Sequence, residues 1–315
     1  MQTTGTGRAL PEGVIVTPIT DREQWLELRR RDVTASVIAA LLGVHPYVSG
    51  YGLWAEKKGL LPPTEDNPAM ERGRLLEPVA IELLRRDRPG WIVEAPGAYY
   101  SLPALRIGAT PDTLVHCPER GAGTVQIKTT VDLVFRKDWR DPDTGETVPP
   151  AWIAIQALTE AYLTGSKWAA VAVLVMGFGL ELSIVDVPIH GRLLDRLFKE
   201  VDAFWTMFDS GAKPDPDYGR DANVIAAVYR APDEAAPPVE LVGLDETLAR
   251  RDALKTTMRE AEKELSEIDT RIKAALGNAV KGQAEAWNVS WPLVKSAGYT
   301  VGPREYRSLK VTKRK

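Results

Sequence analysis

The chain has 315 residues, of which 44% are hydrophobic and 26% are charged, so it is long enough for one large or two ordinary folded domains. Its net charge of −3 argues against a protein that coats nucleic acid with its whole surface, although a local basic lining stays compatible with it. The one cysteine, Cys117, excludes an intramolecular disulfide and a cysteine-based zinc or iron–sulfur site.

Three features predict a cytoplasmic protein that does not enter the membrane. The first residues lack the basic start and apolar core of a secretory signal. The most apolar run, residues 168–187, is interrupted by Gly177, Gly179 and Glu181, which predicts two adjacent buried strands rather than a membrane span. A single cysteine also fits a reducing compartment.

Residues 21–31 predict a helix, and Thr34-Ala35-Ser36 should open a second short helix that runs through Leu42 and ends at Gly43. Ser36 would then lie near a helix N-terminus, close in sequence to Arg29. A hydroxyl, backbone N–H groups and a guanidinium group together could hold a phosphate. Alternatively, Thr34 is a simple helix cap and the arginines of residues 29–31 form a solvated face.

Asn67-Pro68 predicts the start of a helix that continues to about Arg86. Glu77 falls within the apolar stripe of that helix. A carboxylate on a core-facing stripe is costly unless it is paired or binds a metal ion. The sequence leaves both readings open: a salt bridge to Arg72 or Arg74, or a metal ligand.

Residues 107–130 predict two strands joined by a glycine-rich turn, within a three-strand meander formed by residues 98–101, 105–115 and 124–130. Because side chains alternate along a strand, Gln126 and Lys128 should share one face, and strand pairing should bring Asp112 beside them. Carboxylate, amide and backbone carbonyl oxygens suit Mg²⁺. The alternative is that these are solvated polar residues at strand ends.

Residues 135–149 are polar, rich in Pro and Gly, and predict an exposed loop. Its cations and aromatic residue could contact a nucleic-acid backbone and stack on a base, or the segment could be a plain surface loop. The residues concerned are Arg136, Lys137, Trp139 and Arg140. A buried helix follows over residues 150–163, with Gln156 offset toward a cleft, and an amphipathic helix covers residues 190–210.

The domain organisation that we expect is an N-terminal tail (1–20), a core domain (21–212), a linker or crossing segment (213–240) and a C-terminal extension (241–315). In the extension, apolar residues recur at spacings of four and three from Leu254 to Leu276, which predicts a helix with a coiled-coil-like seam. Trp287 and Trp291 bound a predicted strand, and a basic tail, residues 308–315, closes the chain.

The order and spacing of these motifs resemble the YqaJ-type viral recombinases, a family that includes the phage lambda exonuclease within the PD-(D/E)XK nuclease superfamily. The resemblance covers residues 21–210. Its motifs in chain order are Trp25–Arg29, Val33–Ser36, Arg72-Gly73 with Glu77, Pro111-Asp112, Gln126-Ile127-Lys128, and Gln156 with Tyr162. It implies an α/β fold in which helices flank a mixed sheet, with a restriction-endonuclease-like core and a helix-plus-strand extension.

The resemblance also implies an activity: a 5′-to-3′ exonuclease that degrades double-stranded DNA from its ends and leaves a 3′ single strand for an annealing protein. It implies a phage- or prophage-encoded protein in a bacterial cytoplasm, and by analogy a ring-like homotrimer. Mg²⁺, with Mn²⁺ able to substitute, would be held by Glu77, Asp112, Gln126 and the Ile127 carbonyl.

The remaining roles follow from the same resemblance. Lys128 would orient or activate the attacking water, with Gln156 helping to position it, beside Asp112 and Gln126. Arg29 and Ser36 would hold the 5′-phosphate.

The sequence departs from the family at one ligand, because the second acid of the motif is usually Glu and here it is Gln126. An amide offers an oxygen but no charge, so the site works with an amide ligand, is weak, or has been silenced by alteration. Three readings stay open: a metal-dependent exonuclease, a DNA-end-binding module of the same fold, and a coiled-coil interaction protein whose core is only a scaffold.

Overall fold

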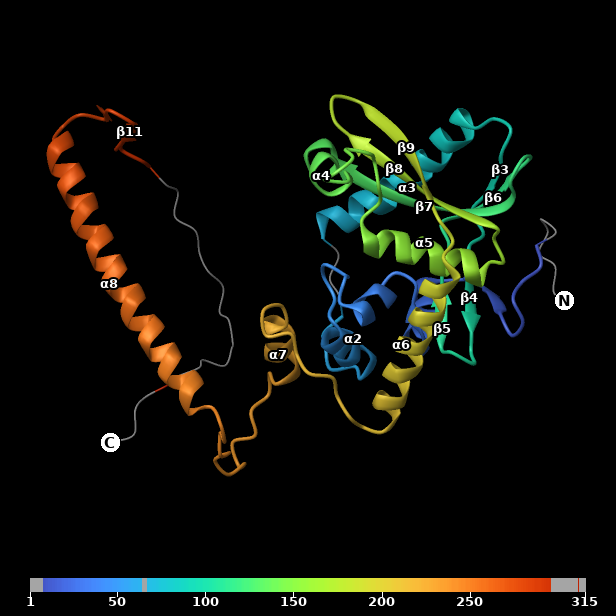
Figure 1. Ribbon diagram of the computed structural model, residues 1–315, viewed down its shortest axis with the longest axis horizontal. Coiled ribbons are helices and arrows are strands. Elements are labelled where there is room, and N and C mark those ends of the chain that lie inside the picture. Colours follow the sequence, from blue (N-terminus) through green and yellow to red (C-terminus); the bar gives the residue numbers. More distant parts are fainter. Residues whose placement is uncertain (1–7, 64–66, 296–310, 312–315) are drawn as a thin grey trace. The chain divides into compact units, whose positions relative to one another are not determined.

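The structure, a computed structural model, describes residues 8–63, 67–295 and 311, and it divides the chain into two compact units, Met1–Arg230 and Ala231–Lys315 (Figure 1). The strands of the first unit are β1 (Ile15–Pro18), β2 (Val33–Thr34), β3 (Ile92–Glu94), β4 (Ala98–Leu102), β5 (Ile107–Ala109), β6 (Thr113–Cys117), β7 (Gly121–Val131), β8 (Trp168–Met176) and β9 (Leu180–Val187). Its helices are α1 (Arg22–Arg31), a 3₁₀ helix (Ile38–Leu42), α2 (Gly50–Lys57), α3 (Pro68–Asp87), α4 (Asp132–Asp138), α5 (Ala151–Leu163), α6 (Gly191–Asp209) and α7 (Ala222–Val228).

The larger sheet of this unit has the strand order β3-β6-β7-β8-β9. β7 and β8 pair in parallel and the other neighbours pair antiparallel, so the sheet is mixed. β8 is a continuous apolar run that is buried on both faces, as expected of a central strand with a parallel neighbour. The predicted α/β class with a mixed sheet flanked by helices is confirmed, as are the two adjacent strands in residues 168–187.

Helices α3 and α5 cover opposite faces of this sheet (Figure 1). Ala80, Ile81 and Leu84 of α3 pack on Val125 and Ile127 of β7. Alternate residues of β7 therefore face α5, whose Ile153, Ala157 and Ala161 pack on the other side. The face of β7 that carries Gln126 and Lys128 is thus the face that α5 covers.

α5 is buried nearly all round because a second core lies on its far side. That core includes Ile155 and Leu163 of α5 together with residues of α2, α6, the 3₁₀ helix and the strands of a smaller sheet, whose order is β1-β4-β5-β2. The predicted helix 150–163 is confirmed. α5 therefore connects the larger sheet to the smaller one.

The smaller sheet corrects two expectations. The N-terminal tail, residues 1–20, contains a strand, because Ile15–Pro18 pairs with β4 and closes the edge of the small sheet. The expected three-strand meander is also wrong: residues 105–115 form two strands that belong to different sheets, β5 and β6, separated at Thr110-Pro111-Asp112. Proline, with no backbone N–H to donate, breaks the ladder there.

Three more helices differ from expectation. α2 was not predicted, and α7 lies within the segment taken as a linker, residues 213–240, where it packs against α2. The expected loop 135–149 begins inside α4, which ends at Asp138. The predicted helices at residues 21–31, 68–86 and 190–210 are confirmed by α1, α3 and α6, and Gly43 ends the 3₁₀ helix in a left-handed conformation.

The second unit consists of a long helix, α8 (Asp245–Leu276), and a hairpin of β10 (Lys281–Ala284) and β11 (Trp287–Ser290). The helix with its stop at Gly277 and the strand near Trp287 confirm the prediction. The seam residues Leu254, Met258 and Leu265 are exposed within the described part of this unit. The predicted basic tail, residues 308–315, lies outside the described residues except for Val311. Among the described residues, no helix is both long enough and apolar enough to cross a membrane.

Gly123 of β7 must lack a side chain because the Trp168 indole lies directly over it. A Cβ at Gly123 would lie 2.0 Å from the nearest ring atom. Gly123→Ala is therefore expected to lower the free energy of unfolding by about 1–3 kcal/mol, as overpacked core positions do. Urea denaturation measures it. Gly73→Ala, in α3 where the added Cβ meets nothing within 4 Å, is the control and should be stabilising by about 0.5–1 kcal/mol. Equal effects at both positions would contradict this account.

Candidate metal-binding and phosphate-binding site

Asp112 lies where the chain enters β6, and the pairing of Thr113 with Val125 places it beside the middle of β7. Its Oδ2 accepts a hydrogen bond of 2.8 Å from the backbone N–H of Ile127 and a second, short one from the Gln126 side-chain amide. The predicted meeting of Asp112 with the motif Gln126-Ile127-Lys128 is confirmed. Burial raises the pKa of Asp112, while the charge of Lys128 and the hydrogen bonds oppose that rise.

Lys128 is held on the α5 side of the sheet by a chain of hydrogen bonds. Its Nζ donates to Oε1 of Gln156 at 3.1 Å, and Nε2 of Gln156 donates to Oε1 of Glu160 at 2.9 Å. The Lys128 ammonium also lies 5.9 Å from the ring centre of Trp152. Gln156, expected to face a cleft, is 6% exposed and faces Lys128 instead.

Glu77 approaches the same region from α3. Burial first, and the negative charge of Asp112 second, raise the pKa of Glu77 to about 7, against the pull of Lys128. The ion pairs of α3 found among the described residues join Arg85 to Glu82 and Arg86 to Asp87. A carboxyl group whose proton affinity is raised by the negative charge of a second one is the arrangement that a bound cation would relieve.

The residue that sequence reasoning missed is Glu160. Its side chain is only 1% exposed, and burial followed by the charge of Asp112 raises its pKa to about 8. A signal was present in the sequence, since Glu160 stands one helical turn after Gln156 in a segment that is otherwise almost wholly apolar.

The donor set is compatible with an oxygen-preferring divalent cation. Glu77 and Asp112 supply carboxylates, and the buried Gln126 Oε1 has no hydrogen-bond partner among the described residues, so an acceptor oxygen stays unused beside them. The described part of the chain holds no cluster of three or more His, Cys, Asp and Glu residues suited to a metal ion. An amide at position 126 leaves two acids where a third would complete such a cluster.

The amide of Gln126 also competes with a cation. Its Nε2 donates to the Asp112 carboxylate, the group a cation would bind. Metal binding would therefore require the amide to turn so that its oxygen, rather than its nitrogen, faces Asp112.

Arg29 and Ser36, expected to hold a phosphate, are brought together at 3.2 Å between Nη2 and Oγ. Thr34 Oγ1 lies 3.1 Å from the same hydroxyl, and the Arg29 guanidinium stacks over Trp25 at 4.5 Å from the ring centre. Burial lowers the pKa of Arg29. Lys57, whose side chain is 2% exposed, donates to the Arg29 carbonyl at 2.8 Å and fixes the end of α1.

His45 positions the backbone of Ser36. Its Nδ1 accepts from the N–H groups of Tyr47 and Val48, so Nε2 carries the proton and donates to the Ser36 carbonyl at 3.1 Å. The His45 ring is 5% exposed and caps this turn. Burial lowers its pKa, which keeps this tautomer neutral.

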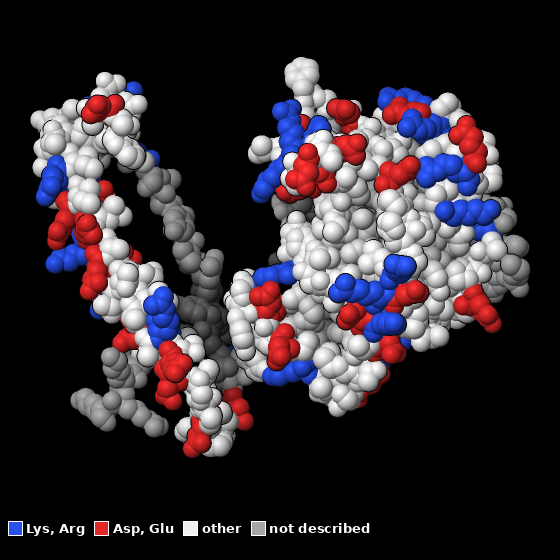
Figure 2. All heavy atoms as spheres, in the orientation of Figure 1, with Lys and Arg blue, Asp and Glu red and all other residues white. Residues whose placement is uncertain are grey.

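The segment after β7 differs from the expected surface at Trp139, while Arg136, Lys137 and Arg140 are exposed. Trp139 is 3% exposed and packs in the α5 core, so it cannot stack on a base from this position. Arg136 pairs with Asp132 one turn earlier on α4, and Arg140 donates to the Gly145 carbonyl. Lys137 lies exposed on α4. Charge is mixed elsewhere too, since acidic and basic side chains interleave on the face shown in Figure 2.

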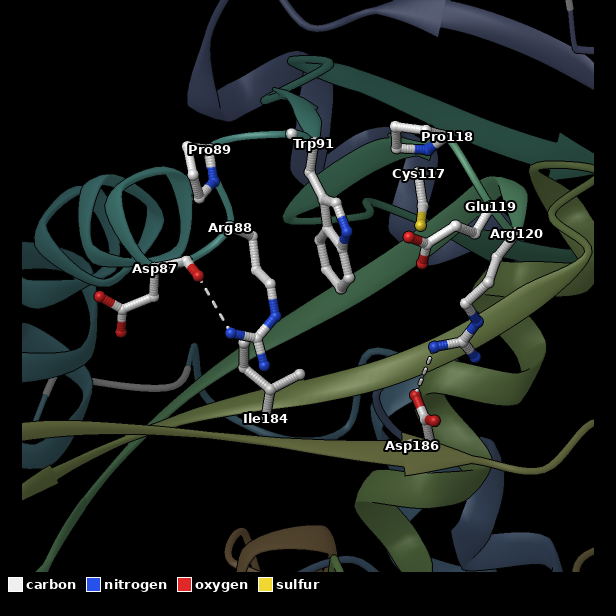
Figure 3. A pocket seen from close by; sticks show the side chains of 11 residues that line it. Asp87, Arg88, Pro89, Trp91, Cys117, Pro118, Glu119, Arg120, Ile184 and Asp186 are labelled. Atoms are coloured by element: carbon white, nitrogen blue, oxygen red, sulfur yellow. Dashed lines mark hydrogen bonds and ion pairs between the residues drawn. The ribbon is translucent and has the colours of Figure 1, made fainter.

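An open pocket of about 530 Å³ lies at the other end of β7, bounded by Arg88, Trp91, Arg120 and Asp186 (Figure 3). Gly121 begins β7 there, and Lys128 lies about 23 Å further along at about 3.3 Å per residue. Arg120 pairs with Asp186 at 2.9 Å and stacks on Trp168. The pocket is therefore separate from the Asp112 site and its charges are largely matched.

The raised pKa of Glu160 has a consequence for stability. A carboxyl group that holds its proton more tightly in the folded than in the unfolded chain costs stability as the pH rises from about 4.5 to about 8. Glu160→Gln is expected to raise the free energy of unfolding of the metal-free protein by about 3–5 kcal/mol at pH 8.5, and by less than about 1 kcal/mol at pH 5. Urea denaturation in a chelator at the two pH values measures it. Glu82→Gln, at an exposed position of α3, should show no such dependence, and a gain from Glu160→Gln that is equal at both pH values would refute the account.

Residues 24–167 match the profile of the YqaJ-like viral recombinase domain. The uncharacterized protein YqaJ of Bacillus subtilis (strain 168) is 23% identical over 279 residues, which are 87% of this chain and 84% of that protein. Among solved structures, the alkaline exonuclease LHK-Exo from Laribacter hongkongensis is 24% identical, with a TM-score of 0.48 over 60% of this chain and 94% of that one. A phage related exonuclease from Haemophilus somnus 129PT is 15% identical, with a TM-score of 0.45 over 57% and 94%.

Proposed function

Residues 24–167 carry a YqaJ-like viral recombinase domain, as the order of the motifs predicted, and on that premise we propose that the chain is a divalent-metal-dependent exonuclease acting on double-stranded DNA ends. The observation that supports it most is the meeting of Asp112, directly before β6, with Gln126 and Lys128 of the central strand β7. The charges of Asp112 and Lys128 also act on Glu77. The family resemblance adds a 5′-to-3′ direction, a 3′ single-stranded product for an annealing protein, and a homo-oligomer.

In the proposed mechanism Glu77 and Asp112, with oxygens of Gln126 and Ile127, would hold Mg²⁺ or Mn²⁺. The cation would neutralise charge on the scissile phosphate and make a nucleophile from water near neutral pH. Lys128, whose ammonium is fixed by Gln156, would donate to a phosphate oxygen or to the attacking water. The cation and Lys128 would position a backbone phosphate and would not contact base edges. Cleavage should therefore be indifferent to the DNA sequence.

The direct test compares linear and closed circular duplex DNA of one sequence, with Mg²⁺ and without it. The expected result is release of nucleotides from the linear form only, and only with the metal. Duplexes labelled at the 5′ or the 3′ end then establish direction, since a 5′-to-3′ exonuclease releases the 5′ label first. Equal cleavage of both topologies would contradict an exonuclease.

The second candidate function is a DNA-end-binding module with little hydrolysis. The observation that favours it is the Gln126 amide, which donates to Asp112 where a cation would bind. This reading predicts that the protein protects linear ends from an added exonuclease and cuts nothing at any Mg²⁺ concentration. The topology test separates the two functions.

Arg29→Ala tests the phosphate pocket. The guanidinium lies 3.2 Å from Ser36 Oγ, and charge-assisted hydrogen bonds to a terminal phosphate are worth roughly 1.5–3 kcal/mol. We expect Arg29→Ala to slow digestion of 5′-phosphorylated ends about 10- to 100-fold and to leave 5′-hydroxyl ends nearly unchanged. The control is Arg30→Ala, because the neighbouring Arg30 side chain is 78% exposed. Equal loss on both kinds of end would assign Arg29 to the fold instead.

A further inference from the structure

The site has an imbalance of charge that its motif residues do not explain. Lys128 is a cation whose hydrogen-bond partner on α5, Gln156, is neutral, and position 126 carries an amide instead of a carboxylate. Asp112 and, from α3, Glu77 interact with Lys128, and with a bound divalent cation the positive charge would exceed the charge of these two acids by one. A third acid within this interface would restore the balance, and α5 supplies one.

Glu160 lies in the same interface. It belongs to α5, which packs on the face of β7 that carries Gln126 and Lys128. Its Oε1 accepts from Gln156 Nε2 at 2.9 Å, whereas its Oε2 is buried without a hydrogen-bond partner among the described residues. An ionised carboxylate oxygen left in that condition is expensive, so the ionised form of Glu160 requires a positive charge or a donor that the described residues do not provide.

The hydrogen bond to Glu160 also decides how Gln156 is oriented. A Gln amide can present either its oxygen or its NH₂ to a neighbour. Because Glu160 Oε1 is an acceptor, the NH₂ end faces Glu160 and the oxygen end faces the Lys128 ammonium. With no acceptor at residue 160, that preference for one orientation would be lost.

We propose that Glu160, ionised once a cation occupies the site, supplies from α5 the negative charge that position 126 lacks, and acts as a positioning residue that holds Gln156 and, through it, Lys128. The inference rests on the proposed nuclease function, and it assigns to Glu160 no contact with the scissile phosphate. The negative charge of the site would thereby come from Asp112, which directly precedes β6, and from two helices, which contribute Glu77 and Glu160.

The experiment moves the charge between positions 160 and 126. Three variants are compared with the unsubstituted chain: Glu160→Gln, Glu160→Ala and the double variant Gln126→Glu/Glu160→Gln. Digestion of linear duplex DNA gives kcat, KM and the Mg²⁺ concentration at half-maximal rate. The Mg²⁺-induced rise in melting temperature gives a measure of metal binding that does not depend on turnover.

Glu160→Gln keeps the size and the acceptor oxygen but removes the charge, so we expect kcat to fall about 10-fold or more and the half-maximal Mg²⁺ concentration to rise about 10-fold, with KM for DNA within about 2-fold. Glu160→Ala also releases Gln156 and should lower kcat about a further 10-fold. The double variant, with the charge restored at position 126, should recover kcat to within about 3-fold of the original. A residue needed only for folding would not be rescued from another element.

Two outcomes overturn the proposal: unchanged kcat and Mg²⁺ dependence in Glu160→Gln, or a double variant as slow as Glu160→Gln alone. Either result leaves the exonuclease function standing, because the unsubstituted chain still cuts. Should the unsubstituted chain cut nothing, the exonuclease function fails, and the melting-temperature series decides the inference. A Mg²⁺-induced rise that is lost in Glu160→Gln and regained in the double variant supports it, and any other pattern overturns it.

Discussion

Asp112→Asn is expected to lower DNA hydrolysis by at least about 1000-fold while leaving the chain folded. Asp112 is the carboxylate that accepts from the Ile127 backbone N–H and the Gln126 amide and that interacts with the charge of Lys128. An Asn oxygen still accepts the Ile127 N–H, but a neutral amide cannot balance a divalent cation, whose contribution to the transition state is several kcal/mol. Single-turnover digestion of linear duplex DNA at saturating Mg²⁺ measures the effect.

The matched control is Asp186→Asn. Asp186 pairs with Arg120 at 2.9 Å at the far pocket, so this change removes an acid of the same kind from the same sheet. It should cost less than about 1 kcal/mol of stability and leave hydrolysis within about 2-fold. Comparable losses from the two substitutions would mean that Asp112 acts through the fold.

Gln126→Glu is expected to strengthen Mg²⁺ binding. A carboxylate in place of the amide adds a charged ligand of nearly the same size, worth on the order of 1–3 kcal/mol, or about 10- to 100-fold in Mg²⁺ affinity. Without metal, the new carboxylate would face Asp112, to which the amide now donates, so two like charges would meet in a buried place. The variant should therefore melt lower than the original chain in a chelator and gain more from added Mg²⁺.

Isothermal titration with Mg²⁺ and melting curves with and without metal measure both effects. Gln283→Glu on β10, in the second unit, serves as a control that adds the same charge elsewhere. Unchanged affinity would show that residue 126 is not a ligand. If the Mg²⁺ affinity rises and the DNA remains intact, DNA-end binding is favoured over the exonuclease function.

The pattern of the sequence was enough to predict the elements that are long or sharply bounded. The alternation of β7, the capped start of α3 at Asn67 and the seam of α8 each follow from a period or a cap that depends on local residues. From the strand period and one pairing, the contact between Asp112 and Gln126 was also predictable.

What the sequence did not predict depends on packing between distant segments. Trp139 looks like an exposed aromatic in a polar loop, yet it fills the core beside Ile153 because α4 turns it inward. From the sequence, β5 and β6 appear as one strand, because the alternation of side chains does not indicate that the chain passes from one sheet to another at Pro111. Glu160 is a single acid in an apolar helix, and its place beside Gln156 and Lys128 emerges only when α5 lies on β7.

The double coverage of α5 makes the precision of the site depend on residues that are far from it. One side of α5 carries Gln156 and Glu160 and packs on β7. On the other side, Ile155 and Leu163 pack in the core that includes the smaller sheet. A truncation such as Leu163→Ala would leave a hole behind the helix, and the helix could shift toward it by a fraction of an ångström. Lys128 would then lose its alignment although no residue near it had changed. Variation in the small sheet can therefore adjust the rate of hydrolysis while every motif residue stays the same.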